Sequence, residues 1–463
     1  MAQGKPLQQC RRKNSEFRTL ITLNAVFFQN LLNKIKRRRN RFNLQSRPKL
    51  LRDRLLQFKN SSSKAVFYLS LLAVLVFILA NIYPLVAGYF NFTLNRANND
   101  GGAAVLPWEA RERLTLLLVG LDEPDSQHTF IDGLTVLVID PEIKKLGIFN
   151  INSDLNVYVP TPGASYNIRT LYNNKKVKDN ELQVLISAVE SLLALTINRY
   201  AVINIKGFKE VSAGLNAVSL NLARDVRDKD TLDIADKFVY FEKGSNVILQ
   251  QEFFPFLASD VNGKDDQLSR QVAFFRELVR NNISLSNFTK IPQLLDSISK
   301  NVSTNLSKSE FFSLAYTLYG IREDQVTGNY TKLSASILAD KKNFYQTYNP
   351  IIENIDDAVA DIFFNLSFFK EQAQIEVLNG SGIKGLAQNR ARWITNSGGR
   401  VIHIGNTPQE EEQSVAYIAE PEKFPYTVKE IKKIFKNKIA IVESPYRYRF
   451  LGDMVIVLGK DNY

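Results

Sequence analysis

An uncharged apolar segment near the N-terminus constrains the architecture of this chain more than any other feature. Residues 65–83 read AVFYLSLLAVLVFILANIY, and the uncharged run continues to Phe90. As an α-helix rising about 1.5 Å per residue, such a run crosses a hydrocarbon layer about 30 Å thick. It begins too far from the N-terminus, and is too long, for a cleaved signal peptide. We therefore predict a single transmembrane helix over residues 65–90.

The positive charge of the chain precedes this segment. The formal net charge is +12, but residues 1–64 carry 17 Lys or Arg against 2 acidic residues, so the rest of the chain is net −3. Because basic residues beside a span stay in the cytoplasm, residues 1–64 are expected to form a basic cytoplasmic tail. Residues 91–463 are then extracytoplasmic. The sequence thus predicts a single-pass protein of the plasma membrane.

The tail itself leaves two interpretations open. Apolar residues recur at helical spacing before the basic run KIKRRRNR at 34–41. The tail is either an amphipathic helix on anionic lipid or a solvated segment that only sets the orientation. Since no second basic patch follows, we expect no nucleic acid among the partners.

Cysteine and histidine are too scarce for several kinds of site. Cys10 is the single cysteine, and His128 and His403 are the two histidines. An internal disulfide and a Cys/His zinc site are therefore excluded, and a His-based triad is disfavoured. Asn-x-Ser/Thr triplets after residue 90 leave open a glycosylated receptor-like ectodomain, against which the lack of disulfides argues. Any chemistry would use carboxylates, hydroxyls, Arg or Lys.

From residue 114 the pattern changes to short, nearly continuous apolar runs. LTLLLVG at 114–120, LTVLVID at 134–140 and LGIFN at 146–150 are typical of strands covered on both faces. A Pro-Glu turn joins the last two as a hairpin, so the sheet is expected to be mixed. A helix is expected over 181–195 and a further strand over 199–205. Together these elements predict an α/β/α domain.

A second, smaller α/β unit is expected after it. It opens with QIEVL at 374–378, continues through a Gly-rich turn and a helix, and ends with MVIVLG at 454–459. We divide the chain after the span into a linker over 91–113, an α/β/α domain over 114–355, a connector over 356–373 and a small C-terminal α/β domain over 374–463.

Three stretches combine these strands with acidic and glycine positions at fixed spacing. They are LLLVGLDEPDSQHTFIDGLTVLVIDPEIKKLGIFNINSDLNVYVP at 116–160, NRYAVINIKGFKEVSAGLNAVSLNL at 198–222, and IEVLNGSGIKGLAQNRARWITNSGGRV at 375–401 with the terminal GDMVIVLGKD. Their order resembles that of the LytR-CpsA-Psr family of bacterial cell-envelope proteins, with its small LytR C-terminal domain. The resemblance implies transfer of a glycopolymer from a polyprenyl pyrophosphate carrier to the cell wall.

The same resemblance implies a site. In the family a lipid groove lies between sheet and helices, arginines hold the pyrophosphate, and aspartates hold a divalent cation, usually magnesium. Dense phosphate charge suits guanidinium groups and a hard, oxygen-ligated cation. The match assigns a magnesium site to Asp122 and Asp132, and the candidate catalytic residues are Asp132, Asp154, Arg270 and Gln271.

Each of these residues also has a purely structural interpretation. The aspartates could cap turns at strand ends, and Arg270 could form a salt bridge at the edge of the core. Likewise, an apolar stripe could line the lipid groove or pack in the core. It consists of Phe253, Phe254, Phe256 and Leu257.

The arginines of the family pattern are missing from this chain. Their positions fall on Thr129 or Phe130, Ser153, Ser259, Val261 and Gln267, and residues 121–168 contain no arginine. Arg169 and Arg224 lie elsewhere in the pattern. Each missing guanidinium removes a charge-assisted contact to pyrophosphate.

The sequence therefore supports two hypotheses about function. The first is a membrane-anchored envelope protein that binds envelope glycan or a polyprenyl-linked precursor, with catalysis lost or altered, and whose C-terminal domain meets a protein partner. The alternative is an active phosphotransferase that attaches lipid-linked glycopolymers to the cell wall through a diverged magnesium-dependent site.

Overall fold

The structure is a computed structural model. It describes residues 87–97, 107–108, 110–123, 129–159, 163–173, 181–227, 240–282, 290–332, 336–340, 347–443 and 451–461. The predicted tail, and the predicted span up to residue 86, lie outside the described residues. Within the described ranges, none of the helices has the length and apolar character needed to cross a bilayer.

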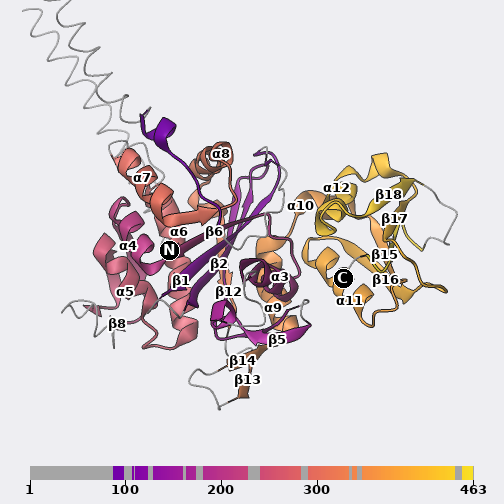
Figure 1. Cartoon of the computed structure of the whole chain (residues 1–463), viewed down its shortest axis with the longest axis horizontal. Coiled ribbons are helices and arrows are strands. Elements are labelled where there is room, and N and C mark those ends of the chain that lie inside the picture. Colours follow the sequence, from indigo (N-terminus) through magenta and orange to yellow (C-terminus); the bar gives the residue numbers. More distant parts are fainter. Residues whose placement is uncertain are drawn as a thin grey trace, which may run out of the picture. The chain divides into compact units, whose positions relative to one another are not determined.

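A six-stranded mixed sheet forms the centre of the domain that we call the central domain, residues 87–363 (Figure 1). The hairpin predicted from the Pro-Glu turn is confirmed, because β2 and β3 pair antiparallel. The sheet is mixed, since β1 and β6 pair parallel. The strand order is β11 (Val302–Thr304), β6 (Arg199–Asn204), β1 (Leu114–Asp122), β2 (Phe130–Asp140), β3 (Lys145–Asn150) and β12 (Val326–Tyr330).

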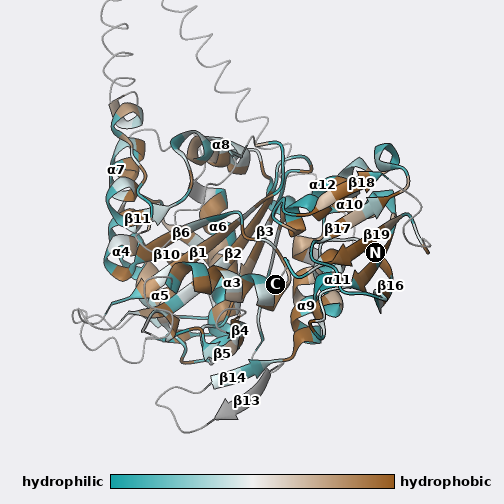
Figure 2. Ribbon diagram, turned by 45° about the vertical axis from the view of Figure 1, so that its right-hand side comes forward, coloured by the Kyte–Doolittle hydropathy of each residue, from teal (hydrophilic) through white to brown (hydrophobic). Residues whose placement is uncertain are grey.

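Helices cover both faces of this sheet, as the apolar runs predicted. In β1 the side chains of Leu117 and Val119 enter one core, and those of Leu114 and Leu116 enter another on the opposite face. The alternation follows from the two-residue period of a strand, and Figure 2 shows the hydrophobic colour of β1, β2 and β3. The helices are α3 (Glu181–Leu193), α4 (Ile205–Ala213), α5 (Phe253–Ala258), α6 (Lys264–Asn282), α7 (Ile291–Asn301), α8 (Lys308–Tyr319) and α9 (Ile352–Phe363).

The helix α9 begins before the expected connector and ends inside it. Its residues Val359, Ile362 and Phe363 are buried in the same core as α3. The remaining strands of the central domain form short two-stranded sheets at its margin. They are β4 (Asn156–Val159) with β5 (Ala164–Asn167), β7 (Val218–Leu222) with β10 (Gly244–Ile248), β8 (Val226–Arg227) with β9 (Tyr240–Phe241), and β13 (Ser336–Asp340) with β14 (Thr347–Pro350).

The C-terminal domain, residues 366–461, has its own five-stranded sheet and its own core. Its last strand, β19, is fully buried and lies in the middle of the sheet, as a run of five apolar residues predicts. The elements are α10 (Leu366–Glu371), β15 (Gln374–Asn379), α11 (Leu386–Asn396), β16 (Arg400–Asn406), β17 (Val415–Ile418), α12 (Pro425–Ile434), β18 (Ala440–Glu443) and β19 (Met454–Leu458).

Candidate functional site: an apolar cavity with a charged cluster beside it

An apolar cavity of about 280 Å³ lies between the central sheet and the helices α4, α5 and α6. Its walls are almost entirely hydrocarbon, and none of the described residues that line it is Arg or Lys. The lining includes Leu118, Gly120, Asp132, Gly133, Thr135, Ala201, Ile203, Phe208, Phe254, Leu257, Gln271 and Phe275.

The cavity exists because the sheet lacks side chains at one point. Gly120 of β1 and Gly133 of β2 are paired in register, and Ala201 of β6 lies in the neighbouring strand. A Cβ atom on Gly133 would meet only backbone atoms of Gly120, at 3.7 and 3.8 Å. Two paired glycines therefore hollow the sheet face that α5 and α6 cover, since paired residues point to the same face.

The apolar stripe of α5 packs in the core, as one of the two predictions expected, and part of it also lines the cavity. Phe253 and Phe256 are fully buried in a core with Phe274. Phe254 and Leu257 line the cavity, and Leu257 also belongs to that core.

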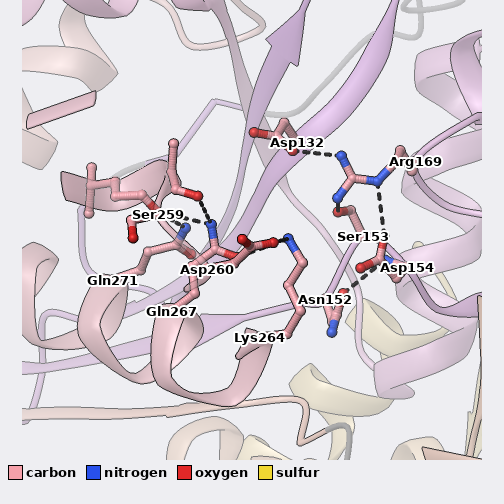
Figure 3. Close-up of polar contacts among 12 residues, drawn as sticks. Asp132, Asn152, Ser153, Asp154, Arg169, Ser259, Asp260, Lys264, Gln267 and Gln271 are labelled. Atoms are coloured by element: carbon pink, nitrogen blue, oxygen red, sulfur yellow. Dashed lines mark hydrogen bonds and ion pairs between the residues drawn. The ribbon is translucent and has the colours of Figure 1, made fainter. Parts of the chain in front are cut away.

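A charged cluster adjoins the cavity through Asp132, which lines it (Figure 3). The guanidinium of Arg169 donates to Asp132 Oδ1 at 2.7 Å through Nη1 and to Asp154 Oδ1 at 2.9 Å through Nε. Its Nη2 donates to the hydroxyl of Ser153 at 3.0 Å. Two of the candidate aspartates are therefore joined by one arginine, which also reaches the position of a missing family arginine at Ser153.

The backbone explains how Arg169 reaches this place. Its carbonyl accepts a hydrogen bond from Ile131 N, and its amide donates to Ser153 O. Residue 169 thus bridges β2 and the segment after β3. Arg169 lies elsewhere in the linear family pattern, but its side chain contacts Asp132, Ser153 and Asp154.

The electrostatics of the cluster follow from burial and proximity. Burial favours the neutral form of Arg169, but Asp132 and Asp154 outweigh it and raise the pKa of the guanidinium above its ordinary value. Burial raises the pKa of the Asp122 carboxyl, and the charge of Asp132 adds to the rise, while Arg169 opposes it. Asp122 and Asp132 are therefore close enough to interact; Asp122 pairs with Phe130 at the end of β1, and Asp132 lies at the register shift of β2.

Gln271 belongs to the cavity, whereas Arg270 ties two helices together. The amide of Gln271 donates to Leu257 O at 3.0 Å and accepts from the buried Asn150. Arg270 donates to the carbonyls of Phe256 and Ser259 in and after α5 and forms an ion pair with Asp266. Burial lowers the pKa of Arg270 below its ordinary value, although Asp266 opposes the change. These contacts of Arg270 are all made within the central domain.

A divalent cation needs oxygen ligands, and the carboxylates of this site are its candidates. In the described part of the chain, no group of three or more His, Cys, Asp or Glu side chains is arranged to hold a metal ion. Magnesium is commonly held by one or two protein carboxylates, with water and substrate phosphate completing the shell. Asp122 and Asp132 are two carboxylates of this kind, and their charges repel each other.

This chain belongs to the LytR-CpsA-Psr family, whose model matches residues 91–360. Residues 372–461 match a second model, described as the LytR cell envelope-related transcriptional attenuator. The matched residues 91–360 contain the mixed central sheet described above.

Curated relatives include transferases of teichoic acid to peptidoglycan. The polyisoprenyl-teichoic acid–peptidoglycan teichoic acid transferase TagV of Bacillus subtilis is 25% identical over 47% of this chain, and the match spans only 56% of that protein. The corresponding TagU of Bacillus mycoides is 23% identical over 48% of this chain and 69% of its own length. The crystal structure of B. subtilis TagV superposes with a TM-score of 0.45 at 22% identity, covering 54% of this chain and 94% of that one.

Proposed function

We propose that this protein binds a polyprenyl-pyrophosphate-linked glycopolymer at the outer face of the membrane, with the polyprenyl chain in the apolar cavity. The observation that carries the proposal is the juxtaposition of an apolar cavity of about 280 Å³ with the Asp132–Arg169–Asp154 cluster. A hydrocarbon chain gains free energy by leaving water for such walls. A phosphate group needs the positive charge that the guanidinium supplies.

Binding with altered catalysis is favoured over unmodified family chemistry. The one arginine of the cluster already donates through all three of its nitrogens, to two carboxylates and a hydroxyl. A phosphate would have to share or displace these partners. Arg270, the other candidate arginine, is committed to carbonyls of α5.

A second candidate function is transfer of the glycopolymer. It is favoured by the contact of Arg169 with Ser153, because a guanidinium there is near a position where the family pattern requires one. In that reaction an acceptor hydroxyl attacks the phosphorus attached to the glycopolymer. The bond from that phosphorus to the bridging oxygen breaks, and polyprenyl phosphate leaves with the electron pair. Asp132, at the cavity wall, would take the proton of the hydroxyl.

One experiment separates the two candidates. The purified full chain in detergent is incubated with magnesium, a polyprenyl-pyrophosphate-linked glycan and a peptidoglycan fragment, and both bound lipid and released polyprenyl phosphate are measured. We expect stoichiometric lipid binding without release. Release that is lost in Asp132→Ala would establish transfer instead, and the absence of bound lipid would refute both candidates.

The cation belongs to the same proposal. Asp122 and Asp132 would hold magnesium, which would supply positive charge to the phosphates when bound. The proposed lipid and cation thus share one aspartate, and Arg169 and the ion would balance the charge of the pyrophosphate together.

A pH dependence follows from the raised pKa of Asp122. In the absence of ions, the stability linked to Asp122 is present at low pH and is lost as the pH rises through its raised pKa. Magnesium requires the ionised carboxylate. We therefore expect the magnesium-induced rise in melting temperature to disappear on acidification at a pH above the ordinary value of 3.8. Asp122→Asn should abolish the rise at every pH, whereas the exposed control Asp296→Asn should retain it; an unchanged response in Asp122→Asn would contradict the site.

Membrane anchoring through residues 65–90 is part of the proposal, with residues 1–64 in the cytoplasm. Exposed aromatic side chains near the end of the apolar run support it, because such rings favour the interface between lipid and water. Phe90 is 73% exposed, and Tyr316 on α8 is 80% exposed. The ring of Tyr89 contacts Phe312 of α8 at a centroid distance of 5.0 Å, so the last residues of the run and α8 form one aromatic surface.

A further inference from the structure

A second and larger cavity, of about 570 Å³, lies between the central and C-terminal domains. Its walls are formed by the segment before β1, by α3, by the start of β6 and by α12. Unlike the apolar cavity, it is lined by many charged and polar side chains. They include Glu112, Arg113, Gln183, Glu190, Asn198, Arg199, Asn305, Lys429, Lys432, Lys433, Lys436 and Asn437.

The two domains are joined beside the cavity by partly buried polar contacts. Arg392 of α11 pairs with Asp356 of α9, and it donates to the carbonyls of Ser191 and Leu192 at 2.9 and 2.6 Å. These carbonyls lie in the last turn of α3, where a cation also complements the helix dipole. On the other side, Arg113 donates to Glu430 of α12 at 2.9 Å. The cavity is therefore built by the fold rather than by a loose contact.

Lysines on and just after α12 give this cavity a positive wall. Lys429, Lys432 and Lys433 follow the spacing i, i+3, i+4, which places them on one face of α12, and Lys436 lies just after the helix. The chain outside its N-terminal tail is net −3, so this concentration of positive charge is local.

The lining of this cavity contains more lysines than carboxylates that can pair with them. The two arginines of the lining have carboxylate partners of their own, since Arg113 pairs with Glu430 and Arg199 with the buried Glu310. The four lysines face only two carboxylates of the lining. Glu112 takes Lys429 and Lys433, at 2.8 and 3.1 Å, and Glu190 takes Lys436 at 2.8 Å.

Lys432 is the lysine left over. It is exposed, and it has no ion-pair partner in the part of the chain that the structure describes. Burial also raises the pKa of the Glu190 carboxyl, although the charge of Lys436 opposes the rise. Glu190 is therefore a weaker counter-charge for the lysines than an exposed carboxylate would be. An anion entering the cavity would thus meet ammonium groups that the protein does not fully neutralise.

We propose that this cavity binds a lipid-free segment of a phosphodiester-linked glycopolymer, whose phosphates meet Lys429 and Lys432 while its hydroxyls meet the amides of Gln183 and Asn437. The aromatic ring of Trp108 provides an apolar wall for a sugar ring. The volume lies in the range of ordinary ligand pockets. The inference rests on the proposed function, because it assigns to the polymer a site separate from that of the polyprenyl chain.

The test uses the full chain in detergent and two probes. Poly(glycerol phosphate) without lipid reports on the charged cavity, and polyprenyl phosphate reports on the apolar cavity. The double variant Lys429→Gln/Lys432→Gln leaves Lys433 on Glu112, so no carboxylate is left unpaired. We expect its affinity for poly(glycerol phosphate) to fall about fivefold to tenfold, in line with two partly exposed charge pairs, while its affinity for polyprenyl phosphate and its melting temperature stay unchanged.

A matched control removes the same charge from the same domain. Lys370 and Lys423 are exposed, and neither lines the cavity. Lys370→Gln/Lys423→Gln should bind the polymer as the wild type does; an equal loss in both double variants would overturn the proposal in favour of a general charge effect. Equal binding of polyglutamate of the same charge would overturn the preference for phosphodiesters.

The two proposals fail in different ways. Wild-type protein that binds polyprenyl phosphate but no polymer would overturn the second cavity and leave the proposed function standing. Protein that binds the polymer through Lys429 and Lys432 but no polyprenyl lipid would overturn the proposed function and support a polymer site alone.

Discussion

Replacing Gly133 by leucine is expected to abolish binding of a polyprenyl chain while the protein remains folded. The side chain would extend into the cavity, because a Cβ at this position meets only backbone atoms of Gly120, at distances of ordinary contact. The backbone of Gly133 is not in the left-handed region that strains other residues. Filling an apolar cavity commonly raises the free energy of unfolding by about 0.5–2 kcal/mol. Loss of lipid binding should therefore accompany an unchanged or raised melting temperature.

A graded series makes this result specific. Gly133→Ala adds one methyl group and should weaken binding of polyprenyl phosphate less than Gly133→Leu does. Ala213→Leu introduces the same side chain at an exposed position of α4 and should bind as the wild type does. Binding is measured with a fluorescent polyprenyl phosphate, and folding by thermal melting. Wild-type affinity in Gly133→Leu would show that the lipid lies elsewhere.

The elements that sequence alone predicted are those whose buried residues form a local pattern along the chain. The runs that became β1, β2 and β3 are nearly continuous in apolar residues because both sheet faces are covered. α3 was predicted from one apolar face, and its Leu182, Leu185 and Val189 are indeed fully buried. Hydrophobic period and length are enough for such segments.

The edge strand β12 could not be predicted in this way. Its sequence, VTGNY, has no apolar alternation, and it becomes a strand by pairing in parallel with β3. Gly328 permits this, because a Cβ there would lie 2.3 Å from Val272 Cγ1 of α6. Such long-range pairing depends on a helix placed earlier in the chain, which no local pattern contains.

The site shows the same division between local and long-range information. Asp132 and Gln271 were proposed from the family pattern, and both line the cavity. Arg169 was not among the candidates because family positions are matched along the chain. Its backbone hydrogen bonds to Ile131 and Ser153 hold residue 169 beside the site, and no local pattern predicts them. The available signal was its isolation, as the first arginine after a stretch of 55 residues (114–168) without one.

Replacing Arg169 by glutamine is expected to lower the melting temperature of the protein by roughly 6–12 °C. The change removes donors to Asp132 and to Asp154, and the Asp154 side chain is only 11% exposed. Leaving a buried carboxylate without its partner costs about 3 kcal/mol, toward the low end of the usual range because Asp132 keeps a third of its surface in water. For a domain of this size, 1 kcal/mol corresponds to about 2–4 °C.

Stability alone would not distinguish a structural arginine from one that binds phosphate. The double variant Arg169→Gln/Asp154→Asn neutralises the orphaned carboxylate and should recover most of the lost melting temperature. Its affinity for polyprenyl phosphate should still fall about tenfold or more, because a charge-assisted contact to phosphate is gone, while its affinity for the uncharged polyprenol stays unchanged. Arg169→Lys should restore phosphate binding only in part, because an ammonium group lacks the planar fork that spans two carboxylates. Equal affinity of the double variant and the wild type for polyprenyl phosphate would restrict Arg169 to holding β2 and the segment after β3 together, and the phosphate would then need another partner.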